Sequence, residues 1–523
     1  MTDLKNPASA PLAAPFGSYS KTLALRSRET PEKIALRDSG GELTWAEMHA
    51  KVERIAARLV ETGLAEGQSV AILGTSSIAY ALVFLAAVRA GGVAAPLTTS
   101  ASRAQLEGMA ADSGASHLFV DRAKTAELAA SDTGAFLPEL THIILDEELE
   151  SWMAPEGTLA PAHDPQPGDP FNIIYSSGTT GTPKGIVHSH SMRWTQFAPI
   201  GLSILEADVD PVSLASTPLY SNTTMAGFLP VLLAGGTVNI MGKFKTVDWL
   251  ETAQRFDVAV TMLVPVQYQR LMDEPRFDEF DLSALKLKYC TSAPFSAELK
   301  RQVLDRMPGG LVEIYSMTEG GVVCLLSAHE FLDKLHTVGR PSPGSVVKVL
   351  DDNDNEVAPG QPGNLVGHSQ TMMTGYKNQP GKTQEGYWTD PDSGETWQRM
   401  GDIGRVDADG FVELVGRAKD MIISGGFNIF PSDLEAELEK DPRVAEAAVI
   451  GVPSKQWGET PLGFVRLADG VDEAEVADIM GQANGNVGKT QRLSALQAID
   501  EMPRSHIGKL LKSELRDRVN SLE

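Results

Sequence analysis

Residues 173–190 read IIYSSGTTGTPKGIVHSH: two apolar runs enclose hydroxyl-bearing residues and glycines, followed by a single lysine, Lys184. A flexible linker is the simplest interpretation of a Gly-rich segment. The apolar runs on both sides favour a loop between two packed elements instead. Glycines allow backbone amides to approach an anion, hydroxyl groups donate hydrogen bonds, and a lysine adds charge. We therefore interpret residues 176–185 as a phosphate-binding loop.

The spacing of this loop differs from that of the nucleotide-binding P-loop. That motif has four residues between its glycines and then Lys-Ser or Lys-Thr. Here Gly178 and Gly181 are closer together, and Gly185 follows Lys184. The loop is therefore not of the Walker type.

The composition indicates a globular protein of several domains. A chain of 523 residues exceeds what one hydrophobic core usually serves, so two or more domains are expected. Its two cysteines, Cys290 and Cys324, cannot form a disulfide framework and lie in no metal-binding pair. We expect both to behave as small buried hydrophobes in a reducing compartment.

The net charge of −24 argues against nucleic acid or an anionic membrane as the main partner. It does not exclude a phosphate ligand, because charges beyond roughly 8 Å are screened at physiological salt. The N-terminus lacks the order of a signal peptide. The most apolar window, residues 79–97, is interrupted by Arg89 and by Gly91-Gly92, so no membrane span is predicted. We expect a cytoplasmic protein.

Strands alternate with helices over most of the chain, which predicts an α/β fold with helix-covered, mostly parallel sheets. Apolar residues recur at helical spacing from Thr44, a candidate N-cap, to Leu59. A second helix is expected at residues 79–90. The predicted strands are residues 69–73, 93–97, 212–217, 258–263 and 288–291.

The C-terminal part has a different pattern. Residues 400–415 contain Asp-Ala-Asp-Gly between two extended runs, which predicts a hairpin. A helix is then expected from Pro431 and a strand at residues 445–452. These features indicate a small α+β domain. We place the domains at residues 1–418 and 419–523.

The segment YSSGTTGTPKGIVHSH resembles the signature loop of the adenylate-forming superfamily, which includes acyl- and aryl-CoA synthetases, luciferases and peptide-synthetase adenylation domains. The resemblance extends from about residue 30 to the C-terminus. Further motifs occur in the family's order: Ser292-Ala293-Pro294, YSMTE at 315–319, GD at 401–402, GRAKDMIISGGFNIFP at 416–431 and PRSHIGK at 503–509. The resemblance implies a large N-terminal domain and a small mobile C-terminal domain.

The resemblance also implies a reaction. A carboxylate is a poor electrophile because its leaving group would be oxide, and joining it to AMP supplies a better one. The implied cofactors are ATP, Mg²⁺ and coenzyme A, and the implied catalytic residues are Lys509, Glu319 and Thr180. By its position, Lys509 matches the lysine that bridges the substrate carboxylate and the α-phosphate. Glu319 is the expected Mg²⁺ ligand, because a hard cation prefers carboxylate and phosphate oxygens.

The family motifs place the remaining ligand-binding residues along the chain. Tyr315 is expected to stack on adenine, and Asp402 to accept hydrogen bonds from the ribose hydroxyls. The implied nucleotide site comprises Ser176, Ser177, Gly178, Thr179, Thr180, Gly181, Thr182, Lys184, Ser292, Ala293, Pro294, Glu313, Ile314, Tyr315, Thr318, Asp402 and Arg417. The implied hinge is Lys419, and the implied pantetheine tunnel is lined by Gly425, Gly426 and Phe427. Three positions depart from the family pattern, because Ser316, Thr291 and Ser292 replace the usual glycines.

The acyl group is expected to bind residues 218–228 and 264–268. A histidine common in CoA synthetases is replaced by Ser221, and no aspartate that would pair an α-amino group lies between Pro218 and Phe228. A hydrophobic monocarboxylic acid (aromatic, arylalkanoic or fatty) fits best. Gly227, Gly320 and Gly321 are expected to leave room for it. The predicted pocket residues are Tyr220, Asn222, Met225, Phe228, Val266, Tyr268 and Gly320.

Three functions stay open at this point. An AMP-forming carboxylate–CoA ligase leads, and an adenylating enzyme that loads a carrier protein is the first alternative. A nucleotide-binding regulator without chemistry is the second, although the joint presence of Lys184, Glu319, Asp402 and Lys509 argues against it. A homodimer is compatible with the resemblance. His188 and His190 receive no role.

Overall fold

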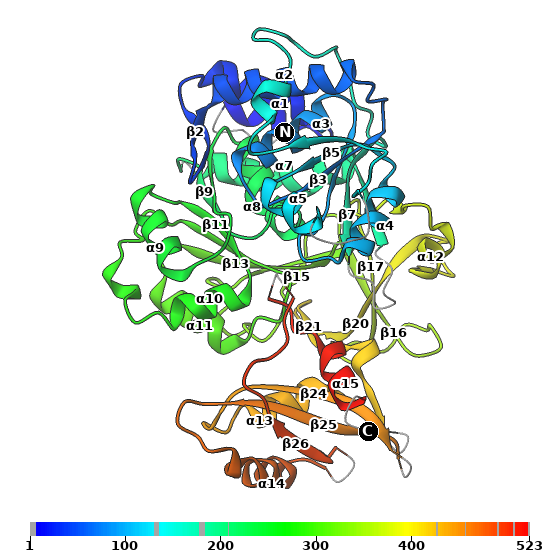
Figure 1. Ribbon diagram of the computed structural model, residues 1–523. Coiled ribbons are helices and arrows are strands. Elements are labelled where there is room, and N and C mark those ends of the chain that lie inside the picture. Colours follow the sequence, from blue (N-terminus) through cyan, green and yellow to red (C-terminus); the bar gives the residue numbers. More distant parts are fainter. Residues whose placement is uncertain are drawn as a thin grey trace. The chain divides into compact units, whose positions relative to one another are not determined.

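The computed structural model describes residues 7–129, 135–176, 184–207, 209–424, 427–454, 457–488, 491–505 and 508–520 (Figure 1). They form two compact units that are interleaved along the chain. Unit 1 comprises Met1–Leu335, Ser342–Ser345 and His368–Gln398, and unit 2 comprises His336–Pro341, Val346–Gly367 and Arg399–Glu523. The predicted domain boundary at residue 419 falls inside unit 2 and stays a prediction.

Unit 1 contains two sheets with largely parallel strands, which confirms the predicted fold class. The first has the strand order β18 (Gly375–Tyr376), β8 (Lys184–Ser189), β7 (Pro170–Ser176), β4 (Val93–Pro96), β3 (Ser69–Leu73), β5 (Ala115–Val120), β6 (Thr141–Ile144). The second has β14 (Gly320–Ser327), β13 (Gly310–Met317), β12 (Leu287–Cys290), β11 (Val260–Leu263), β9 (Val212–Ala215), β10 (Thr237–Ile240), β1 (Ile34–Asp38), β2 (Gly41–Thr44).

The two helices predicted in unit 1 are confirmed. The helix α2 (Trp45–Glu61) begins with a capping box, in which the Thr44 hydroxyl accepts from the Glu47 N–H and the Glu47 carboxylate accepts from the Thr44 N–H. The helix α3 (Ile78–Arg89) is buried from Tyr80 to Val88, as its apolar sequence predicts. One core joins these helices to α1 (Tyr19–Glu29), α7 (His190–Glu206), α8 (Asn222–Leu233) and strands of both sheets. Both cysteines are buried, and burial raises the pKa of each thiol, as expected of structural cysteines.

The parallel strands of the second sheet position the site. The strands β9, β11, β12 and β13 run parallel to one another, so their carboxyl ends lie at the same edge. The segments after them carry the predicted acyl and nucleotide residues. At the end of β13 the chain reverses through Thr318 and Glu319 into the antiparallel strand β14.

Unit 2 contains the predicted hairpin. The strand β20 (Thr396–Val406) pairs antiparallel with β21 (Val412–Arg417), and the Asp407 carboxylate accepts the N–H groups of Asp409 and Phe411 in the turn. A second sheet has the order β23 (Phe427–Ile429), β22 (Ile422–Ser424), β25 (Gly458–Leu467), β24 (Val444–Ser454), with β26 (Ala495–Ala498) paired to β25.

The second sheet of unit 2 is covered on both faces. Side chains on one face join the core of α13 (Pro431–Leu438) and α14 (Val476–Asn486). Alternate residues of β24, including Ala448 and Ile450, belong to a separate core with Leu515 of α15 (Lys512–Asn520). This alternation is the period of two that a strand imposes. Both the helix predicted from Pro431 and the following strand are confirmed.

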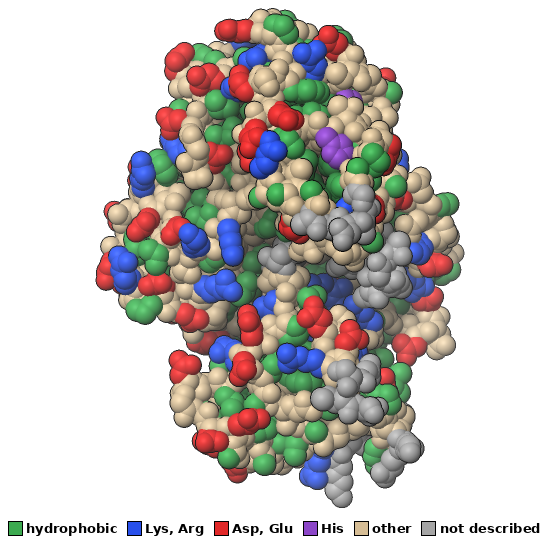
Figure 2. All heavy atoms as spheres, in the orientation of Figure 1, with side chains coloured by type: hydrophobic (Ala, Val, Ile, Leu, Met, Phe, Trp, Pro, Cys, Tyr) green, Lys and Arg blue, Asp and Glu red, His purple; other side chains and the backbone are tan. Residues whose placement is uncertain are grey.

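The surface carries charges of both signs, and acidic and basic side chains are interspersed on the face drawn in Figure 2. Within the described ranges, no helix combines the length and the apolar character that a bilayer-spanning helix requires.

Replacing Thr44 tests the capping box. Thr44→Ala should lower the free energy of unfolding by about 1 kcal/mol, because the Glu47 N–H at the start of α2 loses its side-chain acceptor. Urea denaturation followed by circular dichroism measures the change. Thr44→Ser retains the hydroxyl and should stay within a few tenths of a kcal/mol of the wild type; equal losses in both variants would contradict the capping role.

Candidate active site

The turn between β13 and β14 places Glu319 beside a distant segment of unit 1. Gly320 has φ +90°, and a Cβ there would lie 1.9 Å from the Thr371 carbonyl oxygen. The Met373 N–H donates to the Glu319 carbonyl at 2.8 Å. The sequence predicts that Gly320 leaves room for the acyl group. In the structure, residues 371–373 pack beside Gly320, and glycine is required for this close approach.

The Glu319 side chain meets a tyrosine that sequence reasoning missed. The Tyr376 hydroxyl donates to the Glu319 carboxylate at 2.8 Å, and the Lys184 ammonium lies 4.9 Å from the centre of the Tyr376 ring. Burial, and then the charge of Glu319, raises the pKa of Tyr376. The structure therefore joins two predicted site residues, Glu319 and Lys184, through one aromatic side chain.

The buried side chain of Arg193 orients His188, which in turn binds the Thr318 carbonyl. Arg193 is fully buried and donates to the side-chain oxygens of Asn172, Gln196 and Asn222, and to Nδ1 of His188 at 2.9 Å. Because a guanidinium only donates, the His188 Nδ1 must accept, and its protonated Nε2 donates to the Thr318 carbonyl at 2.8 Å. Burial, followed by the charge of Arg193, lowers the pKa of His188 well below its usual value. His188, to which the sequence assigned no role, thus positions the turn that carries Glu319.

The predicted adenine side lies at the ends of β12 and β13. Ser292 has φ +81°, and its hydroxyl forms a hydrogen bond with the Thr223 hydroxyl. The Glu313 carboxylate is buried and paired with the Lys300 ammonium at 2.5 Å. Burial raises the pKa of Glu313 to about 7, and Lys300 opposes that rise. Glu313 is thus engaged inside the protein, with its backbone in register between Cys290 of β12 and Leu326 of β14.

Most of the predicted acyl-pocket side chains belong to the core. Met225, Phe228 and Tyr268 are at most 1% exposed, and the Tyr268 hydroxyl donates to the Tyr289 carbonyl. A Cβ on Gly227 would lie 2.9 Å from that of Met262, so this glycine allows α8 to approach β11. The predicted positions that remain half-buried include Asn222 and Val266, whereas Tyr220 is 8% exposed.

Unit 2 brings together residues of three separate motifs. Asp402 and Arg417 are partners across β20 and β21, and the Arg417 Nε lies 2.9 Å from an Asp402 carboxylate oxygen. Lys509 is exposed as a residue, yet desolvation of its ammonium, together with the charges of Arg417 and Lys419, lowers its pKa. Asp402 and Asp420 oppose that shift. The interactions show that Lys509 lies within electrostatic reach of the predicted ribose-binding pair.

Hydrogen bonds tie Lys509 to Ser505. The Lys509 N–H donates to the Ser505 hydroxyl at 3.1 Å, and the Ser505 N–H donates back to the Lys509 carbonyl at 2.8 Å. The Leu511 N–H donates to the Pro503 carbonyl at 2.8 Å. These bonds fix the backbone at Lys509 relative to Pro503 and Ser505.

Part of the predicted site lies outside the described residues. These are Ser177, Gly178, Thr179, Thr180, Gly181 and Thr182 of the phosphate loop, and Gly425 and Gly426 of the predicted tunnel. For Ser176 and Phe427 the structure describes the backbone alone. The flanks of the loop are the antiparallel strands β7 and β8, with Ser176 opposite Lys184, so the predicted packed elements on both sides are confirmed.

The described carboxylates suit a metal ion that takes most of its ligands from the substrate phosphates and from water. Across the described ranges, no group of three or more His, Cys, Asp or Glu residues is arranged to hold a metal ion. Mg²⁺ commonly takes one or two protein carboxylates and completes its shell with phosphates and water. Glu319, half-buried and with one oxygen engaged by Tyr376, fits such a role.

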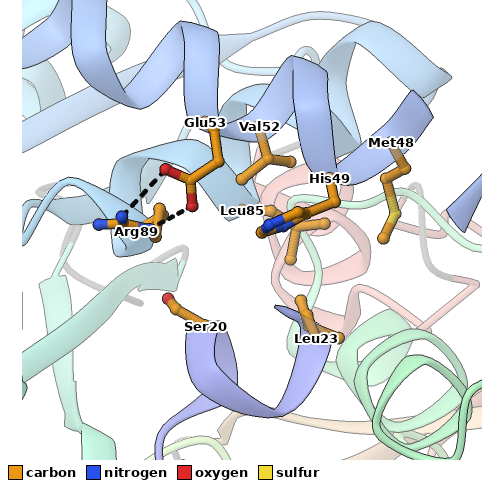
Figure 3. Close-up of a pocket in the computed structure, with 8 residues that line it drawn as sticks. All are labelled: Ser20, Leu23, Met48, His49, Val52, Glu53, Leu85 and Arg89. Atoms are coloured by element: carbon orange, nitrogen blue, oxygen red, sulfur yellow. Dashed lines mark hydrogen bonds and ion pairs between the residues drawn. The ribbon is translucent and has the colours of Figure 1, made fainter. Parts of the chain in front are cut away.

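A small cavity between α1, α2 and α3 is separate from these residues (Figure 3). Its volume of about 20 Å³ is room for a water molecule and too small for an organic acid. At the wall of this cavity, the Glu53 carboxylate forms a bidentate ion pair with the Arg89 guanidinium. The lining residues are Ser20, Leu23, Met48, His49, Val52, Glu53, Leu85 and Arg89, none of which is a predicted site residue.

Comparisons with known proteins agree with this arrangement. A family model described as AMP-binding enzyme matches residues 23–377, and another, described as AMP-binding enzyme C-terminal domain, matches residues 433–509. A feruloyl-CoA synthase from Amycolatopsis sp is 33% identical over 507 residues, which cover 94% of this chain and 97% of that protein. An indoleacetate–CoA ligase from Aromatoleum aromaticum is 30% identical over 513 residues, 94% and 96% of the two chains. ATP-bound MatB from Rhodopseudomonas palustris aligns with a TM-score of 0.85 at 28% identity, covering 96% of this chain and 99% of that one.

The chain belongs to the AMP-binding enzyme family. The predicted membership of the adenylate-forming superfamily is thereby confirmed. Its class is that of the ATP-dependent acid–thiol ligases.

The neutral state of His188 predicts a pH dependence of stability. An unfolded histidine takes up a proton near pH 6.5, whereas the buried His188 does so only at a lower pH. As the pH falls below about 6.5, the free energy of unfolding should therefore fall, by up to about 1.4 kcal/mol per pH unit from this residue. Urea denaturation between pH 5 and 7 compares the wild type with His188→Gln.

The variant should show a shallower pH slope, since the other histidines titrate in both proteins. Identical pH slopes in the wild type and the variant would mean that His188 is not held in its neutral form in the folded protein.

Proposed function

We propose that this protein is an AMP-forming carboxylate–CoA ligase that activates a hydrophobic monocarboxylic acid, with aromatic and arylalkanoic acids as the first candidates. The observation that carries the proposal is the pairing of Arg417 with Asp402 at 2.9 Å in unit 2, together with the influence of both charges on the pKa of Lys509, which comes from a motif near the end of the chain. Two relatives that are named for feruloyl and indoleacetate thioesters favour an acid with a ring. Fatty acids stay in the range of candidates.

In the proposed first step, a carboxylate oxygen attacks the α-phosphorus of ATP. The new P–O bond forms as the bond to the β-phosphate oxygen breaks, which gives acyl-adenylate and pyrophosphate. Lys509 supplies the positive charge that lets two anions approach each other, and its role is electrostatic stabilisation of the charge that develops. Lys184 and the loop of residues 176–185 hold the departing phosphates.

The remaining residues hold the nucleotide. Asp402 accepts hydrogen bonds from the ribose, while Arg417 keeps its carboxylate in place across the hairpin. Tyr315 stacks on the base, and Thr318 contacts the phosphates. Glu319 is the proposed Mg²⁺ ligand; the bound ion supplies neutralisation of phosphate charge.

In the proposed second step, the thiolate of coenzyme A attacks the acyl carbon and AMP leaves. Lys419 is the proposed hinge, a position at the end of an element where backbone dihedrals can change between the two steps. Gly425, Gly426 and Phe427 are the proposed lining of the thiol tunnel. A cytoplasmic location and a homodimer stay predictions.

Replacing Lys509 separates the two steps. Lys509→Ala should lower acid-dependent ATP–pyrophosphate exchange about a hundredfold or more, because the developing charge loses its cation. It should still convert preformed acyl-adenylate and thiol to thioester. Lys440, an exposed lysine of unit 2, provides the matched control variant Lys440→Ala. Full exchange activity in Lys509→Ala would remove Lys509 from the proposed mechanism.

The substrate and the acceptor are tested together. Pyrophosphate release is measured with a panel of benzoates, cinnamates, arylacetates and fatty acids, and the products with ATP and free coenzyme A are identified by mass spectrometry. Acyl-CoA formation with one acid class would support the proposal. Pyrophosphate release without acyl-CoA would favour the alternative, in which a carrier protein receives the acyl group. No release with any acid would contradict both.

A further inference from the structure

We propose that Tyr376 is a positioning residue that presents Glu319 to the metal and Lys184 to the phosphates of ATP. This inference rests on the proposed function and on the proposed metal role of Glu319. Tyr376 lies in none of the motifs that predicted the site. It lies on the strand β18, which pairs with β8, the strand that begins at Lys184.

The hydroxyl of Tyr376 sets the position of the Glu319 carboxylate. Glu319 lies on a two-residue turn, and a glutamate side chain there has several rotatable bonds that a ligand would have to order. The hydrogen bond of 2.8 Å from Tyr376 engages one carboxylate oxygen in advance. The second oxygen is then the natural ligand for a cation, since a carboxylate offers about four lone-pair sites.

The ring of Tyr376 faces the positive charge of Lys184. The Lys184 ammonium lies 4.9 Å from the ring centre, within the distance of about 6 Å at which an aromatic face attracts a cation. Lys184 belongs to the C-terminal end of the phosphate loop, and its backbone is held in β8. Tyr376 thus contacts an anion at its hydroxyl and a cation at its face.

The backbone of Tyr376 is fixed to both partners. On one side, the Thr374 N–H donates to the Val187 carbonyl at 2.9 Å and the Lys377 N–H donates to the Gly185 carbonyl at 2.7 Å, both on β8. On the other side, the Met373 N–H donates to the Glu319 carbonyl at 2.8 Å. Residues 373–377 therefore link the phosphate-loop strand to the β13–β14 turn, and Tyr376 is the side chain that reaches both charges.

Tyr376→Phe removes the hydroxyl and keeps the ring, so it tests the carboxylate contact alone. We measure Mn²⁺ binding by electron paramagnetic resonance in the presence of α,β-methylene ATP, whose bridging group cannot be cleaved. The apparent Kd for Mn²⁺ should rise roughly tenfold, as expected for loss of one charge-assisted hydrogen bond. The Mg²⁺ concentration required for pyrophosphate exchange should rise in parallel, while thioester formation from preformed adenylate stays unchanged.

Two further variants and a control complete the experiment. Tyr376→Leu also removes the ring and should weaken binding of the ATP analogue, beyond the effect of Tyr376→Phe. Glu319→Gln should raise the Kd for Mn²⁺ at least as much as Tyr376→Phe. Tyr289→Phe, which removes the hydroxyl of a buried tyrosine of β12 outside the predicted site, should behave as the wild type.

Each outcome decides the matter. If Glu319→Gln weakens Mn²⁺ binding and Tyr376→Phe does not, the positioning role is wrong and the proposed function is unaffected. If neither variant changes Mn²⁺ binding, the metal role of Glu319 is wrong and the inference falls with it. If Tyr376→Phe lowers the Tm and both half-reactions equally, Tyr376 is merely structural. A wild type that releases no pyrophosphate with any acid contradicts the proposed function, independently of these variants.

Discussion

Parallel strands can be joined only by connections that return the chain to the same end of the sheet. The carboxyl ends of β9, β11, β12 and β13 therefore lie side by side, and four segments distant in sequence share one edge. The antiparallel strand β14 breaks this pattern and creates a tight turn there. The position of Glu319 on that turn depends on this topology, whereas Tyr376 and Lys184 reach it from the strands β18 and β8 of the other sheet of unit 1.

Individual positive charges have strong local effects in this protein, although its net charge is −24. Arg193 is buried among neutral acceptors, and its guanidinium fixes which atoms of its neighbours accept. Burial lowers its pKa to about 9, which reflects the cost of holding a charge away from water. In unit 2, the charges of Arg417 and Lys419 act on Lys509 in the same direction. A strongly acidic protein can thus still offer cations to a triphosphate, because each cation acts over only a few ångströms.

Local patterns of sequence predicted the local structure well. The strand at residues 69–73 and the cap at Thr44 were correct to the residue, since both depend on neighbours a few positions away. The acyl pocket was harder to predict. Apolar residues at helical spacing, such as Met225 and Phe228, are the signal both of a pocket wall and of a helix packed in a core, and these two side chains lie in the core.

The sequence by itself determined the α/β class, the order of the motifs, the family, and residues such as Glu319, Asp402 and Lys509 as candidates, because periodicity and short motifs are local properties. Only the tertiary structure decided that Tyr376 meets Glu319, that His188 supports the Thr318 carbonyl, and that Glu313 pairs with Lys300. The first two contacts join residues 57 and 130 positions apart, and the third joins a helix to the next strand of the sheet. Their geometry arises from strand pairing and helix packing, which no window of sequence contains.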